Sequence, residues 1–256
     1  MAKSVAIVTG ASQGIGRATA VRLAQNFSSI ALVARNLEHL NGTAEQVKSE
    51  GAEPLVIDLD LSERAAADIV VARTLEQFGR IDALLNIAGA VPQIDLLEMT
   101  DEQWDAGMAL KLHGARRLTV RAWDALKAAK GSVVFTSGNS AQFPKAPYAA
   151  VGTINAAIVA LAKAFADRGL QDGVQVNSIL PGPVMTGRRR SYLEHWAPAH
   201  GVSVEAAGEA FLKQAGISRY GEPEEIAGLM AFLVSPAARW MTGSSLRMDG
   251  GEVTSI

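Results

Sequence analysis

Residues 5–16 read VAIVTGASQGIG, and this stretch decides the fold. Its first part is a short apolar run with the length of a β-strand, and residues 14–26 have the apolar periodicity of a helix. Glycine at 10, 14 and 16 lets the backbone turn tightly and approach a pyrophosphate, while the start of the helix offers free N–H groups. A strand, a glycine turn and a helix in this order predict a dinucleotide-binding site.

Strands and helices alternate along the rest of the chain. Further strands are expected at 30–34, 54–57, 81–86, 132–136, 174–180 and 245–248, and helices at 37–50, 63–78, 104–128 and 151–168. The strands are apolar without polar alternation, as in a sheet that is covered on both faces. The pattern therefore predicts an α/β fold: one doubly wound (Rossmann) domain over residues 1–256, with a parallel sheet flanked by helices on both faces.

Residues 187–216 differ from the rest, because they mix arginines and aromatic residues with Pro198 and Gly201 and show only weak helical periodicity. The segment follows a strand end, which is where open α/β sheets bind their ligands. We therefore expect a lid over the substrate, and its arginines and aromatic residues favour an apolar substrate that bears an acid. The alternative is a surface insertion without a role.

Composition excludes several classes of function. The chain has 24 basic and 26 acidic residues among 256, so no nucleic-acid partner is expected, and the basic run at 188–190 is too short to change this. The absence of cysteine excludes disulfides and thiolate metal sites, and the four histidines lack metal-ligand spacing, so no metal is expected. No signal peptide or membrane span is expected, and the predicted location is cytoplasmic.

The spacing Thr-Gly-x-x-x-Gly-Ile-Gly of the turn resembles that of the short-chain dehydrogenase/reductase family. Five further stretches resemble this family in the same order and extend the likeness over nearly the whole chain. They are Asp60-Leu61, Asn86-Ile87-Ala88-Gly89, Trp104-Asp105, 177–182 with Thr186, and 219–227 with Thr242-Gly243 and Asp249-Gly250-Gly251. The resemblance implies a nicotinamide cofactor, a small carbonyl or alcohol substrate, and oxidoreductase activity.

The motifs also indicate which residues hold the cofactor. They are Gly10, Ser12, Gln13, Gly14, Ile15, Gly16, Arg35, Asp60, Leu61, Asn86, Ala88, Gly89, Asn155, Pro181, Gly182 and Thr186. A ribose diol favours a carboxylate at the end of the second strand, whereas a 2′-phosphate requires a cation there. Arg35 stands at that position and Arg17 is a second candidate, so NADP(H) is favoured over NAD(H). The alternative is that Arg35 is an ordinary exposed arginine.

The catalytic residues implied by the resemblance are a Tyr, a Lys four residues later on the same helix face, a Ser and an Asn. Counting back from Asn177 places Val151 at the Tyr position and Asn155 at the Lys position. Counting on from Trp104 places Lys111 where the Asn belongs. Gly138 stands at the Ser position, with Ser137 one residue before it and Ser140 two after.

Three interpretations of this substituted site remain open. In the first, which we favour, the protein is an oxidoreductase with a rebuilt site. Ser137 then polarises the substrate, Tyr148 reaches inward from about 4.5 Å before Val151 along a helix, and Lys111 supplies the missing cation. In the second, the chain is an inactive NADP(H)-binding sensor or regulatory subunit, and in the third it catalyses a reaction without a hydride acceptor. The plainer interpretation is that Tyr148 caps a helix start and Lys111 extends into solvent.

The resemblance also implies a homodimer or homotetramer. In this family the helices expected at 104–128 and 151–168 commonly pair subunits. The second carries a face of small residues that permits close helix packing: Ala156, Ala157, Ala160 and Ala164.

Overall fold

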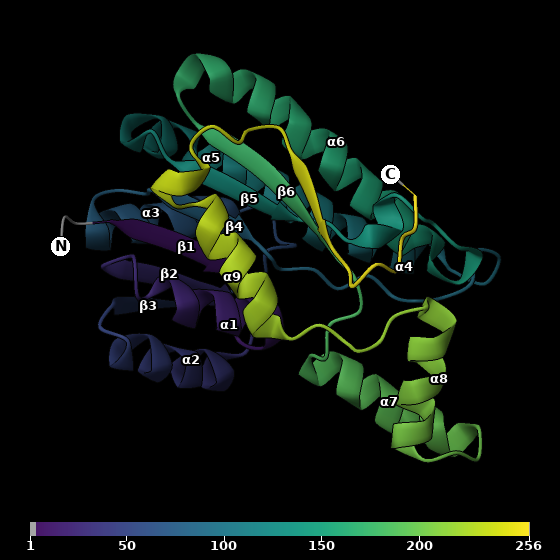
Figure 1. Ribbon diagram of the computed structural model, residues 1–256. Coiled ribbons are helices and arrows are strands. Elements are labelled where there is room, and N and C mark those ends of the chain that lie inside the picture. Colours follow the sequence, from purple (N-terminus) through teal and green to yellow (C-terminus); the bar gives the residue numbers. More distant parts are fainter. Residues whose placement is uncertain (1–3, 256) are drawn as a thin grey trace.

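The computed structural model describes residues 4–255 and places seven strands in one sheet (Figure 1). The strand order is β3-β2-β1-β4-β5-β6-β7, and every neighbouring pair is parallel. The strands are β1 (Val5–Thr9), β2 (Ser29–Ala34), β3 (Glu53–Asp58), β4 (Ala83–Asn86), β5 (Ser132–Thr136), β6 (Gln175–Pro181) and β7 (Ser245–Met248). The predicted doubly wound parallel sheet is confirmed.

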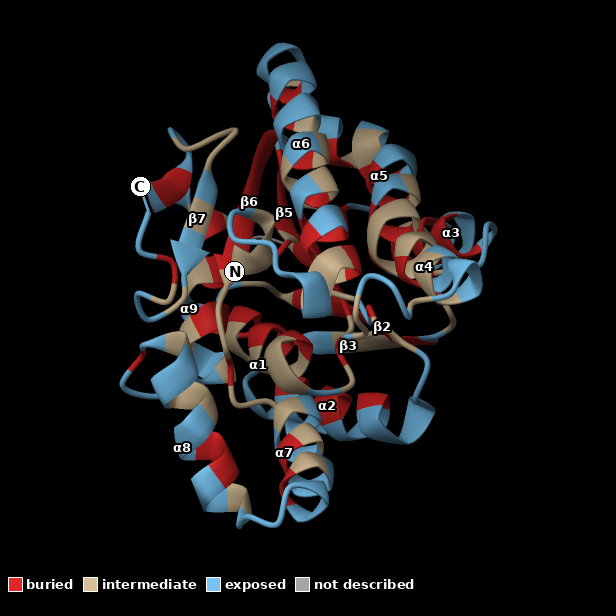
Figure 2. Ribbon diagram, turned by 90° about the vertical axis from the view of Figure 1, so that its right-hand side faces the viewer, coloured by how far each residue is buried: buried red, intermediate tan, exposed pale blue. Residues whose placement is uncertain are grey.

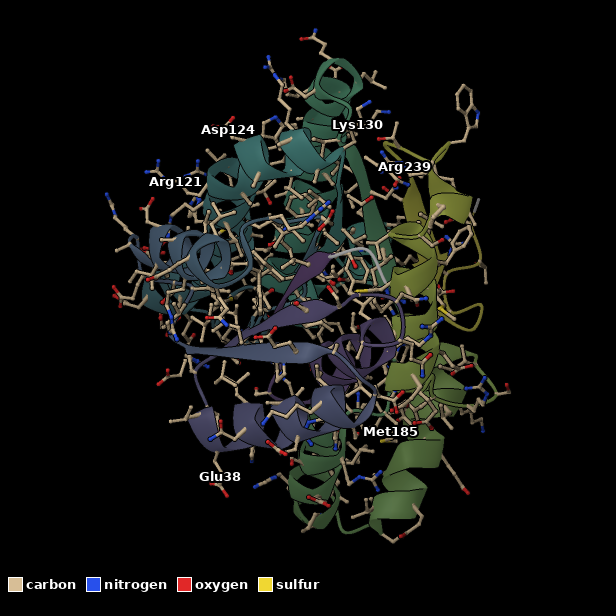
Figure 3. The ribbon with its side chains drawn as sticks, turned by 90° about the vertical axis from the view of Figure 1, so that its left-hand side faces the viewer. Glu38, Arg121, Asp124, Lys130, Met185 and Arg239 are labelled. Atoms are coloured by element: carbon tan, nitrogen blue, oxygen red, sulfur yellow. The ribbon has the colours of Figure 1, made fainter. Side chains whose placement is uncertain are left out.

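Helices cover both faces of the sheet, as predicted. One apolar core joins the sheet to α3 (Ala66–Phe78), α5 (Ala115–Ala129) and α6 (Ala149–Asp172). The other joins it to α1 (Gly14–Leu23), α2 (Leu37–Ser49) and α9 (Pro223–Leu233). Charged residues lie on the outer surfaces of these helices, for example Glu38, Arg121 and Asp124 (Figure 3).

The helix expected at 104–128 is interrupted. It consists of α4 (Asp101–Gly107), a π-helical stretch (Met108–Gly114) and α5. Glycines at both ends of the π-helical stretch allow other parts of the chain to come close: a Cβ on Gly114 would lie 2.9 Å from the carbonyl oxygen of Leu61. Short π-helical stretches within α-helices are frequent at functional sites, and this one contains Lys111.

The ends of the two central strands are joined through one side chain. The hydroxyl oxygen of Thr9, at the end of β1, accepts hydrogen bonds from the N–H groups of Ile87 (2.8 Å) and Ala88 (3.0 Å) after β4. It donates to the carbonyl oxygen of Leu85 at 3.2 Å. Because the chain leaves β1 and β4 in opposite directions, this edge is the switch point at which open α/β sheets bind ligands.

Residues 187–216, which the sequence marked as weakly helical, form α7 (Gly187–Ala199) and α8 (Val204–Ala215). The two helices lie beside each other and apart from the helices that cover the sheet (Figure 1). Their surfaces are largely exposed (Figure 2), and they share a small apolar cluster of Leu193, Ala197 and Ala207. The pair has its own minimal core, and its first turn directly follows the loop after β6.

The long helix that contains α6 is apolar because one of its sides is packed against the rest of the fold. Residues Ala146–Asp172 are long and apolar enough to cross a membrane, so on this measure the expectation of no such segment is wrong. The helix packs against β5 and β6, where Ile158, Ala162 and Ala166 are buried. Ala150 and Ile154 are buried in a separate apolar cluster with Val91. The core helix of a globular fold meets the same criteria of length and composition.

Candidate active site

A cavity of about 560 Å³ lies at the carboxyl ends of the central strands. Most of the residues predicted to bind the cofactor line it: Gly10, Ser12, Gln13, Gly14, Ile15, Gly16, Arg35, Asp60, Leu61, Ala88, Gly89 and Thr186. Residues from the N-terminal, middle and C-terminal parts of the chain therefore meet around one space.

The backbone of the glycine turn fits a pyrophosphate. A Cβ on Gly16 would overlap the carbonyl oxygen of Gly10, and a Cβ on Gly10 would lie 3.1 Å from Cα of Ala88. Within residues 4–255, the N–H groups of Ser12 and Gln13 donate to no protein oxygen. Free N–H groups beside the first turn of α1 form the arrangement that binds phosphate oxygens. This end of the cavity therefore fits the predicted dinucleotide.

The far end of the same cavity carries a cation at the end of β2. Arg35 is exposed there and forms a loose ion pair with Asp60, at 3.4 Å between Nη1 and Oδ2. Asn36 and His39 also line the cavity, and the side chain of Asn36 accepts a hydrogen bond from the N–H of His39 at 2.9 Å. Arg17 does not line it, because its guanidinium donates to the Ser12 carbonyl and the Thr43 hydroxyl and so braces the glycine turn.

Four of the predicted cofactor residues do not line this cavity. Asn86 directs its amide nitrogen to the hydroxyl of Thr119 (3.0 Å) and so connects β4 to α5. Gly182 lines a second, smaller cavity, Pro181 lines neither, and Asn155 lies beside Lys111. The family register places these four residues near the cofactor, but none of them lines the larger cavity.

Lys111 and Asn155 contact each other directly. The ammonium group of Lys111 donates to Oδ1 of Asn155 at 2.5 Å and to the backbone carbonyl of Ser137 at 3.2 Å. The amide of Asn155 donates in turn to the hydroxyl of Ser140 at 2.8 Å, and Asn155 is buried. An ammonium group carries three N–H donors, so two are used here and one is left for a ligand.

Two glycines make room for this pair. A Cβ on Gly138 would lie 2.6 Å from Nδ2 of Asn155, and one on Gly89 would lie 3.0 Å from Cδ of Lys111. Serine at 138 would therefore collide with the Asn155 amide in its present position. Residues 89, 111, 138 and 155 therefore form one packed unit.

Lys111 lines both the larger cavity and the smaller one, which has a volume of about 410 Å³. Removal from water, and secondarily the positive charge of Arg188, lower its pKa from 10.5 to about 8. A lysine at the junction of the two cavities with this pKa can give up or take a proton near neutral pH.

The other two predicted catalytic residues lie less favourably. The hydroxyl of Ser137 is buried and donates to the backbone carbonyl of Asn155 at 2.8 Å, so its proton is already engaged. Tyr148 is the last residue of a short 3-10 turn (Ala146–Tyr148) and stands at the cap position of α6, with φ −132° and ψ 25°. Tyr148 lines neither cavity, whereas Val151 lines the smaller one.

Comparison with known proteins decides the family. A family model described as enoyl-(acyl carrier protein) reductase matches residues 10–252. The short-chain reductase protein NovJ of Streptomyces niveus is 30% identical, over 97% of this chain and 94% of that protein. The chain belongs to the short-chain dehydrogenase/reductase family.

Other members of this family share the length and the fold. The NADPH-dependent reductase BacG of Bacillus subtilis is 31% identical over 100% of both chains. The solved structure of L-sorbose reductase from Gluconobacter frateurii, complexed with NADPH and L-sorbose, superposes with a TM-score of 0.95. It is 27% identical, and the match covers 100% of this chain and 98% of that one.

The site of this short-chain dehydrogenase/reductase also contains residues that the sequence did not single out. Arg188 lines both cavities, and Thr136 lines the larger one with a buried hydroxyl oxygen that has no hydrogen-bond partner within residues 4–255. The run of arginines at 188–190 was a sequence signal for Arg188, although composition alone indicated a solvated loop there. No sequence signal identifies Thr136, because the burial of its hydroxyl depends on the fold around it.

Proposed function

We propose that this chain is an NADP(H)-dependent oxidoreductase that acts on a small carbonyl or alcohol, with Lys111 in place of the family's tyrosine. The observation that carries the proposal is the position of Lys111, which borders the nucleotide cavity and the smaller cavity at once. A group that exchanges a proton with the substrate oxygen has to stand at this junction.

The cofactor part of the proposal rests on the larger cavity. When bound, NADP(H) supplies or accepts the hydride. The turn from Gly10 to Gly16 would hold its pyrophosphate, while Arg35, beside Asn36 and His39, would hold a 2′-phosphate. The preference for NADP(H) over NAD(H) rests on this cation and on the relatives that are named or solved as NADPH-dependent enzymes.

Lys111 provides the proton in the proposed reduction. Two of its N–H groups donate to Asn155 and to the Ser137 carbonyl, and the third N–H donates to no acceptor within residues 4–255. These two oxygens fix the ammonium group, and a substrate oxygen that takes the remaining position receives a proton as it gains charge. Lys111 is then neutral and takes a new proton from water. In the oxidation direction the neutral amine accepts the proton.

The roles of the neighbouring residues follow from their contacts. Asn155 and Ser137 are positioning residues, because they contact Lys111 or its partner and line neither cavity. We assign Tyr148 no proton transfer. That the enzyme is cytoplasmic and a homodimer or homotetramer is part of the proposal and rests on the family.

One observation favours a second candidate, an inactive NADP(H)-binding sensor or regulatory subunit. Val151, which the family register places at the tyrosine position, lines the smaller cavity and cannot exchange a proton. In this alternative the larger cavity binds the cofactor and the ammonium group of Lys111 only stabilises the fold.

Oxidation of NADPH by the purified protein, measured against a broad panel of aldehydes and ketones, separates these functions. We expect turnover with some carbonyl and a loss of about 10³-fold in kcat/KM for Lys111→Met, with an unchanged Kd for NADPH. Lys213→Met, at an exposed lysine of α8, is the matched control and should keep full activity. Tight NADPH binding without any turnover would favour the sensor, and an active Lys111→Met variant would exclude Lys111 as the proton donor.

A further inference from the structure

The smaller cavity carries positive charge that its own walls do not balance. Lys111, Arg188 and Arg189 line it, and none of the described residues that line it is an aspartate or glutamate. Its apolar walls come from Ile15, Val91, Val151 and Val184. A small apolar space with several cations and no carboxylate is suited to a ligand that brings the negative charge with it.

The contacts of the three cations point the same way. Arg188 donates to the carbonyl oxygen of Val91 at 3.2 Å, and the guanidinium carbon of Arg189 lies 5.7 Å from the ring centre of Tyr192. Lys111 contacts only neutral oxygens. Within residues 4–255 none of the three forms an ion pair, whereas Arg80, Arg168 and Arg219 each pair with a carboxylate.

The start of α7 adds an independent observation. The first turn of a helix favours acidic residues, because the positive end of the helix dipole lies there. The helices α4 and α9 follow this rule, with Asp101 and Glu224 in their first turns, whereas α1, α5 and α6 have no acid there. The first turn of α7 contains no acid and consists of glycine followed by three arginines at 188–190. A helix start that places cations where anions are favoured breaks a local rule, as functional sites do.

The two cations that are nearest the reaction centre also repel each other. The charge of Arg188 acts on Lys111 and contributes to lowering its pKa. An anion bound between α7 and Lys111 would remove this repulsion and would form charge-assisted hydrogen bonds with a guanidinium group.

We propose that the smaller cavity binds a carbonyl compound that carries a carboxylate or phosphate group, with the anion at Arg189 and the carbonyl oxygen at Lys111. This inference rests on the proposed function and names its class of substrate. Arg188 also lines the nucleotide cavity, where it can serve the cofactor, but Arg189 lines only the smaller cavity. Arg189 is therefore the residue that sets the preference for an anion.

The chain offers a matched control for Arg189. Arg190 is the next residue in the same helical turn, is exposed, and lines neither cavity. Arg189→Gln and Arg190→Gln remove the same charge from the same helix, so any general effect of net charge or of the helix dipole is common to both. A difference between them reports the contacts that only Arg189 makes, which are with the smaller cavity and with the ring of Tyr192.

The experiment measures binding by calorimetry to the full chain saturated with NADP⁺, which cannot reduce a carbonyl. The probes are benzoylformate with benzoylformamide, levulinate with levulinamide, and dihydroxyacetone phosphate with dihydroxyacetone. We expect an anionic probe to bind about tenfold more tightly than its uncharged partner. Arg189→Gln should abolish this preference, and Arg190→Gln should preserve it. Whether the carboxylates or the phosphate bind identifies the anion.

Two results would overturn the inference: no anionic probe binds more tightly than its neutral partner, or both arginine variants lose the preference equally. Circular dichroism of each variant shows whether it has folded. The outcome is separable from that of the proposed function. Anion binding without NADPH turnover would contradict the proposed oxidoreductase function and support the anion site. Fast turnover of neutral carbonyls without any preference for anions would support the function and contradict the anion site.

Discussion

The nucleotide cavity and the proposed reaction centre lie side by side at the carboxyl ends of the central strands, and Lys111 stands where they meet. The nucleotide cavity is built from backbone: free N–H groups, close approaches at Gly10 and Gly16, and a strand end fixed by Thr9. The reaction centre is built from side chains that satisfy one another, chiefly Lys111 and Asn155. A site made of backbone tolerates few changes at its glycines, while a site made of side chains can be rebuilt when several of them change together.

The largest effect is expected where the backbone itself is crowded. Gly16→Ala would place a Cβ against the carbonyl of Gly10, and we expect it to lower the free energy of unfolding by about 4 kcal/mol and to abolish NADPH binding. Gly42→Ala in α2 is the control, because a Cβ there meets no atom within 4 Å and alanine favours a helix. Thermal unfolding and NADPH titration measure both variants. Equal behaviour of the two would show that the glycine turn is not constrained as described.

The pairing of Lys111 with Asn155 is tested by exchanging the two residues. Asn155→Lys alone places a second ammonium group beside Lys111, and we expect a loss of about 3 kcal/mol in stability. Adding Lys111→Asn removes the repulsion, so the double variant should regain about 2 kcal/mol of this loss. Chemical denaturation of the wild type, both single variants and the double variant completes the cycle. Additive effects would contradict a direct interaction.

The pH dependence of activity should follow Lys111. Because burial lowers its pKa to about 8, the ammonium form is lost above this pH, where an ordinary lysine stays charged. We expect kcat/KM for carbonyl reduction to fall about tenfold per pH unit above 8. Alcohol oxidation needs the neutral amine, so its kcat/KM should rise as the pH approaches 8 and level off above it. The Lys111→Arg variant stays protonated and should show no such fall, whatever its rate. A wild-type profile that is flat through this range would assign proton donation to another group.

The smallest effect is expected at the exposed end of the nucleotide cavity. Arg35→Ala removes a cation that pairs only loosely with Asp60, so stability should change by less than about 1 kcal/mol. The Kd for NADPH should rise about tenfold, while the Kd for NADH stays the same or improves. If both rise equally, Arg35 does not distinguish the two cofactors.

Much of the fold could be predicted from the sequence, because apolar strands and glycine turns depend on local residues. The helix end at Gly79 was expected and found, since glycine adopts the left-handed conformation that ends α3 (φ 77°). The π-helical stretch at Met108–Gly114 was not foreseen, because its composition is that of an ordinary helix. Asn86 matches its motif yet points to Thr119, since register fixes a position but not the direction of a side chain.

At the proposed reaction centre, the sequence indicated which positions matter but not which side chains contact one another. Spacing predicts that residues 111, 138, 151 and 155 stand at the positions of the family's catalytic residues. Nothing in the spacing indicated that Lys111 and Asn155 form a hydrogen bond. The role of Arg188 at the junction of both cavities depends on α7 folding back toward Val91, which is a long-range contact. Tyr148 follows two prolines, and this local signal for a helix start was the better guide to its place.

The missing side chain at Gly138 determines the order in which this site could change. Because a Cβ there would meet the Asn155 amide, serine at 138 becomes acceptable only after residue 155 has changed. Lysine at 155 is acceptable only after Lys111 has been replaced. A library that varies position 138 alone should return little besides glycine, whereas one that varies 111, 155 and 138 in that order can reach the family's usual residues. The residues at 111, 155 and 138 can therefore be replaced one at a time only in this order.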